Sequence, residues 1–221
     1  MKTVGVVLAG CGYLDGAEIY ESVLTMLALD RGLVPYQCLA PDIEQMHVVD
    51  HLKGEPAKES RRVLIEAARL ARGSVKPLED GWADKLDAVI FPGGFGAAKN
   101  YCDWAVKGDA CGIHPVVQSF MVKMVEARKP VGVICIAPLV LARALKGKDL
   151  HPRLTVGAES AASKSLETFG SRHVACPATD CVVDCEYRIV STPAYMYDTH
   201  IAEVAQGIDK LVHEIVALMN T

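Results

Sequence analysis

The stretch that decides the fold is Val131-Gly132-Val133-Ile134-Cys135-Ile136-Ala137-Pro138. Its first four residues are small or apolar and mostly β-branched, which is typical of a strand buried on both faces of a sheet. Pro138 suits the first turn of a helix, where its missing N–H removes no hydrogen bond, and the helix-competent residues 139–146 follow it. The sequence therefore predicts a strand that turns directly into a helix, with Cys135 at the bend.

Cys135 at such a bend is a candidate nucleophile. A nucleophile elbow lifts its side chain above the sheet edge and places it at the positive end of a helix, which favours a thiolate over a thiol. Ala137 is small, as a sharp elbow requires after the nucleophile, whereas Val133 is larger than the pattern asks for before it. The alternative, a small buried apolar side chain, describes most free cysteines. As an elbow nucleophile, Cys135 is expected to be the most reactive of the eight thiols.

A glycine-rich loop, residues 91–96 (Phe-Pro-Gly-Gly-Phe-Gly), follows another apolar strand predicted over residues 86–91. Glycines let backbone N–H groups face a ligand with no side chain in the way, and such N–H groups form oxyanion holes. A tight turn is the alternative interpretation. No Gly-Lys-Ser/Thr follows, so the loop does not match a phosphate-binding P-loop. Together with Cys135, this loop favours a catalytic site at the carboxyl ends of two strands.

Strands and helices alternate along the chain, which predicts a mainly parallel sheet with helices on both faces. Residues 97–115 are too long for a plain connection and are predicted to be a functional lid or an ordered insertion. With 221 residues and 51% apolar residues, the chain is predicted to be one domain over residues 1–221, a three-layer α/β sandwich. Strands are predicted over residues 3–9, 34–40, 47–51, 86–91, 131–135, 153–156, 182–185 and 188–191, and helices over residues 17–31, 60–72, 116–127, 139–146, 160–169 and 198–219.

The helix predicted over residues 17–31 starts after a glycine-rich loop, residues 10–16, at the end of the first strand. Glu18 lies in its first turn, where a carboxylate stabilises the helix dipole. The same turn projects over the carboxyl edge of the sheet, where ligands bind in open α/β folds, so Glu18 is also a candidate site residue. Apolar residues at helical spacing predict the buried face of this helix: Ile19, Val23, Leu24, Leu27 and Ala28.

Composition and charge disfavour several classes of partner. A net charge of -4 without a basic run argues against nucleic acid, and the longest apolar runs are far too short to span a membrane. The first residues lead directly into a strand with no room for a signal peptide, so a cytoplasmic protein with reduced cysteines is expected. Cys176, Cys181 and Cys185 cluster without the paired spacing of a zinc site, so no metal is expected.

Seven segments spread nearly end to end carry a family resemblance: residues 10–12, 15–19, 63–69, 92–100, 135–138, 192–196 and 207–211. In these segments the chain resembles the ThiJ/PfpI superfamily, which has the flavodoxin-like sheet of the class I glutamine-amidotransferase-like fold. Within it, the chain is most similar to the ElbB branch, whose members are described as glyoxalases or as isoprenoid-biosynthesis proteins with an amidotransferase-like domain.

The resemblance implies a role for each matching site residue. Cys135 would be the nucleophile, and Glu18 would be the carboxylate that hydrogen-bonds its thiol. Gly93, Gly94 and Ile136 would offer the N–H groups of the oxyanion hole. The resemblance also implies a homodimer, and two-fold symmetry is the commonest arrangement in any case.

The chain departs from the many superfamily members that place a His directly after the nucleophile or further along the chain. These positions hold Ile136 and, near the second one, Gly157. Without that base, amide hydrolysis by a Cys-His-Glu set is disfavoured. The sequence therefore favours a cofactor-independent glyoxalase that converts glyoxal or methylglyoxal, a small aldehyde substrate, to a 2-hydroxy acid through Cys135. Two alternatives stay open: an amidase or deglycase, and a non-enzymatic redox-sensing or stress-response protein linked to isoprenoid biosynthesis.

Overall fold

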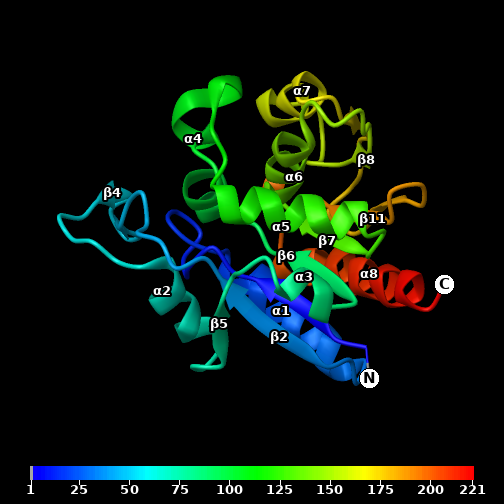
Figure 1. Ribbon diagram of the computed structural model, residues 1–221. Coiled ribbons are helices and arrows are strands. Elements are labelled where there is room, and N and C mark those ends of the chain that lie inside the picture. The colour runs from blue at the N-terminus through cyan, green and yellow to red at the C-terminus, as the bar shows by residue number, and fades with distance from the viewer. Residues whose placement is uncertain (1) are drawn as a thin grey trace.

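The computed structural model describes residues 2–221, and its centre is a seven-stranded sheet in the order β10-β11-β7-β6-β1-β2-β5 (Figure 1). Only the pair β10–β11 is antiparallel among these neighbours. The four central strands β1, β6, β7 and β11 are buried along their whole length, as apolar β-branched strands under two helical layers should be. The strands are β1 (Val4–Val7), β2 (Tyr36–Ala40), β5 (Val75–Pro77), β6 (Ala88–Phe91), β7 (Val131–Ile134), β10 (Val182–Asp184) and β11 (Ile189–Thr192).

Helices cover both faces of this sheet, which confirms the predicted α/β layering (Figure 1). On one face α1 (Ile19–Arg31) packs along α8 (Ile201–Met219), with α2 (Val63–Leu70) beside α1. On the other face α5 (Pro115–Glu126) contacts both α3 (Trp82–Lys85) and α6 (Ala137–Leu145). Within residues 2–221, no helix combines the length and the apolar character that a membrane span requires.

The remaining elements are short. Two small two-stranded sheets pair β3 (Val49–Asp50) with β4 (Glu55–Pro56) and β8 (Arg153–Leu154) with β9 (Arg172–His173), and α7 (Ala161–Thr168) packs on α6. The 97–115 segment is an ordered insertion, with a π-helix (Ala97–Tyr101), α4 (Trp104–Lys107) and a 3-10 turn (Gly108–Ala110) before α5. The sequence did not predict β5 or α3. β5 is a three-residue edge strand that ends at a proline and is largely exposed, so it carries no apolar pattern.

Three loops meet at the carboxyl edge of the sheet, because β1, β6 and β7 are parallel neighbours. Backbone hydrogen bonds join the loops after β1 and β6. Glu18 N donates to Gly93 O at 2.9 Å, and Phe95 N donates to Tyr13 O at 2.7 Å. The loop after β7 contains Cys135 and lies beside them, so this edge brings together the segments that the sequence marked as functional.

The buried face of α1 differs from the predicted one. Ile19, Val23 and Leu27 are 37–45% exposed, whereas the helix buries Glu21, Ser22, Thr25 and Leu29. The hydroxyl groups of Ser22 and Thr25 donate to carbonyl oxygens one turn earlier, which satisfies these buried polar groups without a partner from outside the helix. One carboxyl oxygen of Glu21, Oε2, accepts a hydrogen bond from the glycine loop, as described below. The other two residues predicted for the buried face, Leu24 and Ala28, are partly buried and pack against the core, so the prediction is correct only for part of this face.

Candidate active site

Cys135 lies at the bend between β7 and α6, as predicted. Its φ angle is 61°, in the left-handed region that non-glycine residues rarely adopt, and its N–H donates to Thr192 O at 2.9 Å. The residue is 7% exposed, at the floor of a cavity. Gly93 lies against it so closely that an added Cβ would be 2.5 Å from Cys135 Cβ and 2.7 Å from Ile134 O. Glycine is required at residue 93 because no side-chain atom fits there.

The carboxyl group that contacts the thiol belongs to Glu21. Its Oε2 accepts a hydrogen bond from Gly93 N at 2.8 Å, and the side chain also shares a hydrogen bond with Cys135. Glu18, which the resemblance placed there, caps α1 instead: its Oε2 accepts from Glu21 N at 2.6 Å. The Glu18 side chain lines the same cavity as Cys135. The sequence analysis did not predict Glu21, and its position three residues after Glu18, on the same side of the start of α1, is the signal that could have found it.

Two of the three predicted oxyanion-hole N–H groups face the sulfur. The N–H groups of Gly94 and Ile136 donate to Cys135 Sγ. The N–H of Gly93 is engaged by Glu21 and is not free in this state. Gly94 has a φ of 91°, and an added Cβ there would lie 2.5 Å from Glu18 N, so its loop conformation is open only to glycine.

Burial controls the protonation of the site. Desolvation, followed by the nearby Glu21 carboxylate, raises the pKa of Cys135 well above its ordinary value, although two backbone N–H donors oppose the shift. This direction is opposite to the shift expected from the helix start, because desolvation outweighs the helix dipole here. Desolvation and then Glu18 raise the pKa of Glu21 to about 8. Burial also raises the pKa of Glu18, against the N–H groups at the start of α1. At neutral pH, the thiol and the Glu21 carboxyl are therefore both mainly protonated.

The cavity above Cys135 has a volume of about 410 Å³ and mostly apolar walls. Segments distant in sequence form these walls, so most of them were not predicted as site residues. The segments that the sequence singled out contain four of the remaining wall residues: Phe95 in the glycine loop, Trp104 in the 97–115 segment, and Tyr195 and Met196 within residues 192–196. Across residues 2–221, no histidine lines this cavity. Besides Cys135, Glu18, Gly94 and Ile136, the walls contain Tyr13, Phe95, Trp104, Ser160, Ala161, Ala162, Tyr195 and Met196.

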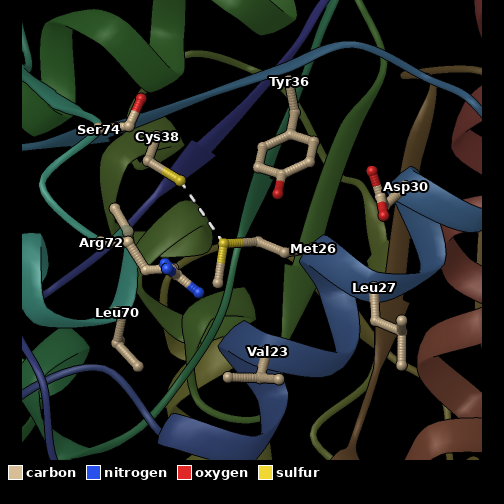
Figure 2. A pocket seen from close by; sticks show the side chains of 10 residues that line it. Val23, Met26, Leu27, Asp30, Tyr36, Cys38, Leu70, Arg72 and Ser74 are labelled. Carbon is tan, nitrogen blue, oxygen red and sulfur yellow. Dashed lines mark hydrogen bonds between the residues drawn. The ribbon is translucent and has the colours of Figure 1, made fainter.

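A second cavity, of about 550 Å³, lies between α1 and the amino end of β2 (Figure 2). Its cysteine, Cys38, contacts the Met26 sulfur at 3.6 Å, and burial raises the pKa of this thiol to about 11. The cavity therefore offers no activated nucleophile. Over residues 2–221, no three or more His, Cys, Asp or Glu side chains are grouped so that they could hold a metal ion. The Cys135 cavity is the candidate active site.

Curated relatives cover nearly the whole chain. The chain is 40% identical to the ES1 protein homolog, mitochondrial, of Rattus norvegicus, over 97% of this chain and 83% of the relative. It is 39% identical to the glutamine amidotransferase-like class 1 domain-containing protein 3, mitochondrial, of Homo sapiens, over 97% and 82%. A Danio rerio ES1 protein, 31% identical, is also named mitochondrial. These names contradict the expected cytoplasmic location, which rested on the first residues alone. No family model matches the chain.

Solved structures with the same fold include one that is similar to this chain in sequence as well. An isoprenoid biosynthesis protein with an amidotransferase-like domain from Ehrlichia chaffeensis superposes with a TM-score of 0.92 at 37% identity, over 99% of both chains. A DJ-1 variant from Schizosaccharomyces pombe superposes with a TM-score of 0.57 at 15% identity, which shows the fold alone. Full-length similarity to the curated relatives and this shared fold lead to one conclusion: the chain belongs to the class I glutamine amidotransferase-like family, within the ThiJ/PfpI (DJ-1) fold family.

Proposed function

We propose that the protein is a cofactor-independent glyoxalase of the ElbB branch, which converts glyoxal or methylglyoxal to a 2-hydroxy acid. The observation that carries the proposal is the contact between the Cys135 thiol and the buried Glu21 carboxyl at the floor of an apolar cavity. A small aldehyde needs a nucleophile, a proton acceptor and a site from which bulk water is excluded. Cys135, Glu21 and the cavity supply these three requirements.

The first step is addition of the thiol to the aldehyde. The ionised form of Glu21 accepts the thiol proton while Cys135 Sγ bonds to the aldehyde carbon and the carbonyl electron pair moves to oxygen. The N–H groups of Gly94 and Ile136 are the donors available to the oxyanion. Glu21 then returns the proton to this oxygen, which gives a hemithioacetal. Since the pKa of Glu21 is about 8, the rate of addition is expected to rise with pH up to that value.

The second step moves a proton between the two substrate carbons. Glu18 lines the cavity, and burial raises its pKa toward the range in which a carboxylate exchanges protons efficiently. It removes the proton from the former aldehyde carbon to give an enediolate and returns it to the adjacent carbon, while the hydroxyl proton passes from the former aldehyde oxygen to the oxygen on that adjacent carbon. The product is a thioester of a 2-hydroxy acid on Cys135.

Water completes the reaction. It adds to the thioester carbon, the C–S bond breaks, and the leaving sulfur takes a proton, which restores the thiol. The sum is one aldehyde and one water converted to one 2-hydroxy acid, with no external oxidant or reductant. Hydrolysis of amides by an amidase or deglycase would need a histidine that accepts the thiol proton and then, as a general acid, protonates the leaving amine, and within residues 2–221 no histidine lines the cavity.

The direct test is turnover of methylglyoxal by the purified protein, with lactate measured by NMR. We expect lactate formation by the wild type and by Cys185→Ser, a matched control because Cys185 is exposed and absent from the cavity lining. We expect no turnover above background by Cys135→Ser. Equal lactate formation by Cys135→Ser and wild type would show that Cys135 is not the nucleophile. The absence of lactate from the wild type and all variants would contradict the glyoxalase proposal.

A further inference from the structure

Two cysteines outside the Cys135 site meet at the base of the 97–115 insertion. Cys102 pairs with Ile113 in an isolated antiparallel bridge, and His114 N donates to Tyr101 O at 2.7 Å, so the two arms of the loop are tied together there. Cys111 lies two residues before Ile113 on the same arm. Cys102 and Cys111 are therefore diagonal neighbours across this bridge, and their side chains lie on the same side of it.

The two thiols are in contact and buried. Cys102 is 4% exposed, Cys111 is 2% exposed, and their side chains share a hydrogen bond. Cys102 Sγ also lies 3.7 Å from Ala97 O, so its thiol proton has two acceptors within reach. Both cysteines are free in this structure. The S–S bond length is about 2.05 Å, so the two sulfur atoms have to approach one another for a disulfide to form, through side-chain rotation together with movement of the loop backbone.

The residues around the two thiols shift the pKa values of Cys102 and Cys111 in opposite directions. The hydrogen bond from Cys102 and the Arg143 guanidinium lower the pKa of Cys111 to about 7, and Arg143 Nε also donates to Cys111 O at 2.9 Å. The same hydrogen bond and burial raise the pKa of Cys102. A nucleophilic thiol beside a protonated one is the arrangement of a reactive and a resolving cysteine. At neutral pH, Cys111 is partly ionised, in contrast to Cys135.

The loop that these cysteines close also forms a wall of the candidate active site. Trp104 lines the Cys135 cavity, and its Nε1 donates to Ser165 Oγ at 3.1 Å. The Ser165 hydroxyl in turn donates to Asp109 of the same loop. Neither α4 nor the following 3-10 turn contains a buried residue, so the loop is held mainly by these polar contacts and can open locally.

We propose that Cys102 and Cys111 are a redox-active thiol pair that a hydroperoxide oxidises to an intramolecular disulfide, and that this bond locks the loop carrying Trp104. Cys111 thiolate attacks a peroxide oxygen, the O–O bond breaks, and the departing alkoxide takes a proton to leave as an alcohol. The resulting Cys111 sulfenic acid is attacked by the sulfur of Cys102, and water leaves with the Cys102 proton. Two thiols and one hydroperoxide thus give one disulfide, one alcohol and one water. Local opening of the loop admits the oxidant.

Disulfide mapping of the intact protein tests the bond without any turnover assay, so the result is independent of the glyoxalase proposal. The protein is treated with tert-butyl hydroperoxide, blocked with iodoacetamide and digested without reduction. We expect a cross-linked peptide pair containing Cys102 and Cys111, equally in wild type and in Cys185→Ser. The pair should be absent from Cys102→Ser, in which dimedone should trap the sulfenic acid on Cys111.

The lock is tested by hydrogen exchange of the amides in residues 103–110, which should slow at least tenfold on oxidation in wild type and remain unchanged in Cys102→Ser. Circular dichroism confirms that each variant is folded, and Cys102→Ala replaces Cys102→Ser if the hydroxyl is not tolerated. Oxidation of Cys135 or Cys185 while Cys102 and Cys111 still react with iodoacetamide would overturn the proposal. If the disulfide forms but the hydrogen-exchange rates of residues 103–110 do not change, the bond does not rigidify the loop, and that part of the proposal is wrong.

Discussion

Burial raises the pKa of three titratable groups at the candidate active site, Glu18, Glu21 and Cys135. Glu21 is fully buried, and its carboxyl lies between the Gly93 N–H and the Cys135 thiol. Burial disfavours every anion here, and the Glu21 carboxyl raises the pKa of Cys135 further, whereas the hydrogen bond with Cys135 lowers the pKa of Glu21. The site therefore holds protons that exposed groups of the same kind would have released, and it has one acceptor ready for the thiol proton when Glu21 ionises.

The first prediction at the residue scale concerns stability against pH. The pKa of Glu21 is raised from 4.5 to about 8 in the folded chain, so between these values the folded state holds a proton that the unfolded state has lost. Stability contributed by this proton is complete below about 4.5 and is lost as pH rises toward about 8. Glu21→Gln stays neutral, so its free energy of unfolding should rise relative to wild type by about 5 kcal/mol across this window. Urea unfolding at several pH values measures the difference, and parallel curves would contradict it.

The second residue-scale prediction separates two roles of Glu18. If Glu18 moves protons on the substrate, Glu18→Gln should lower methylglyoxal turnover by ~100-fold or more while Cys135 remains open to alkylation. The glutamine carbonyl can still accept the cap hydrogen bond from Glu21 N, so the loss of stability should be about 1 kcal/mol or less. Lactate formation and alkylation rate are measured on one preparation. Unchanged turnover would leave Glu18 with its capping role alone.

At the scale of elements, the site depends on how tightly the β6 loop packs under the β7–α6 bend. Gly93→Ala would place a methyl group 2.5 Å from Cys135 Cβ and 3.0 Å from Glu21 Oε2. Because backbone surrounds this position, we expect a loss of about 3 kcal/mol in stability together with loss of turnover. Gly81→Ala is the control, since nothing lies within 4 Å of its Cβ position and its φ of -65° suits alanine. Thermal unfolding compares the two, and equal melting temperatures would refute the packing argument.

At the scale of the whole molecule, the outer face of α1 is apolar. Ile19, Tyr20, Val23 and Leu27 are 37–52% exposed along this helix, and Val23 and Leu27 also line the cavity of Figure 2. Neighbouring apolar side chains of this kind mark association surfaces, and two-fold symmetry is the commonest way for identical chains to cover them. We therefore expect the homodimer to form through α1.

Light scattering at micromolar concentration measures the assembly. The wild type should have the mass of two chains, and Val23→Glu should shift it to one. Ile65→Glu is the matched control, because Ile65 is 60% exposed on α2, outside this face. A wild-type monomer would contradict the dimer, and a Val23→Glu variant that remains dimeric would move the interface away from α1.

The amino-acid sequence alone predicts those parts of the protein that depend on residues close together along the chain. Three features could be predicted in this way: the β-branched strands, the bend at Cys135 and the glycine loop at residues 91–96. Each of them depends on neighbouring residues and on the period of a strand or helix. The parallel order of β1, β6 and β7 then brought those loops to one edge. Short exposed elements such as β5 left no such pattern.

Which side chains are in contact, and how far the pKa of each titratable group is shifted, follows only from the tertiary structure. Glu21 rather than Glu18 contacts the thiol, because Glu21 lies on the buried side of α1 whereas Glu18 caps the start of this helix. Desolvation and then the Glu21 carboxylate raise the pKa of Cys135, whereas the hydrogen bond from Cys102 and then Arg143 lower the pKa of Cys111, although both cysteines are buried. Desolvation and charge act through space, so residue order along the chain does not determine them.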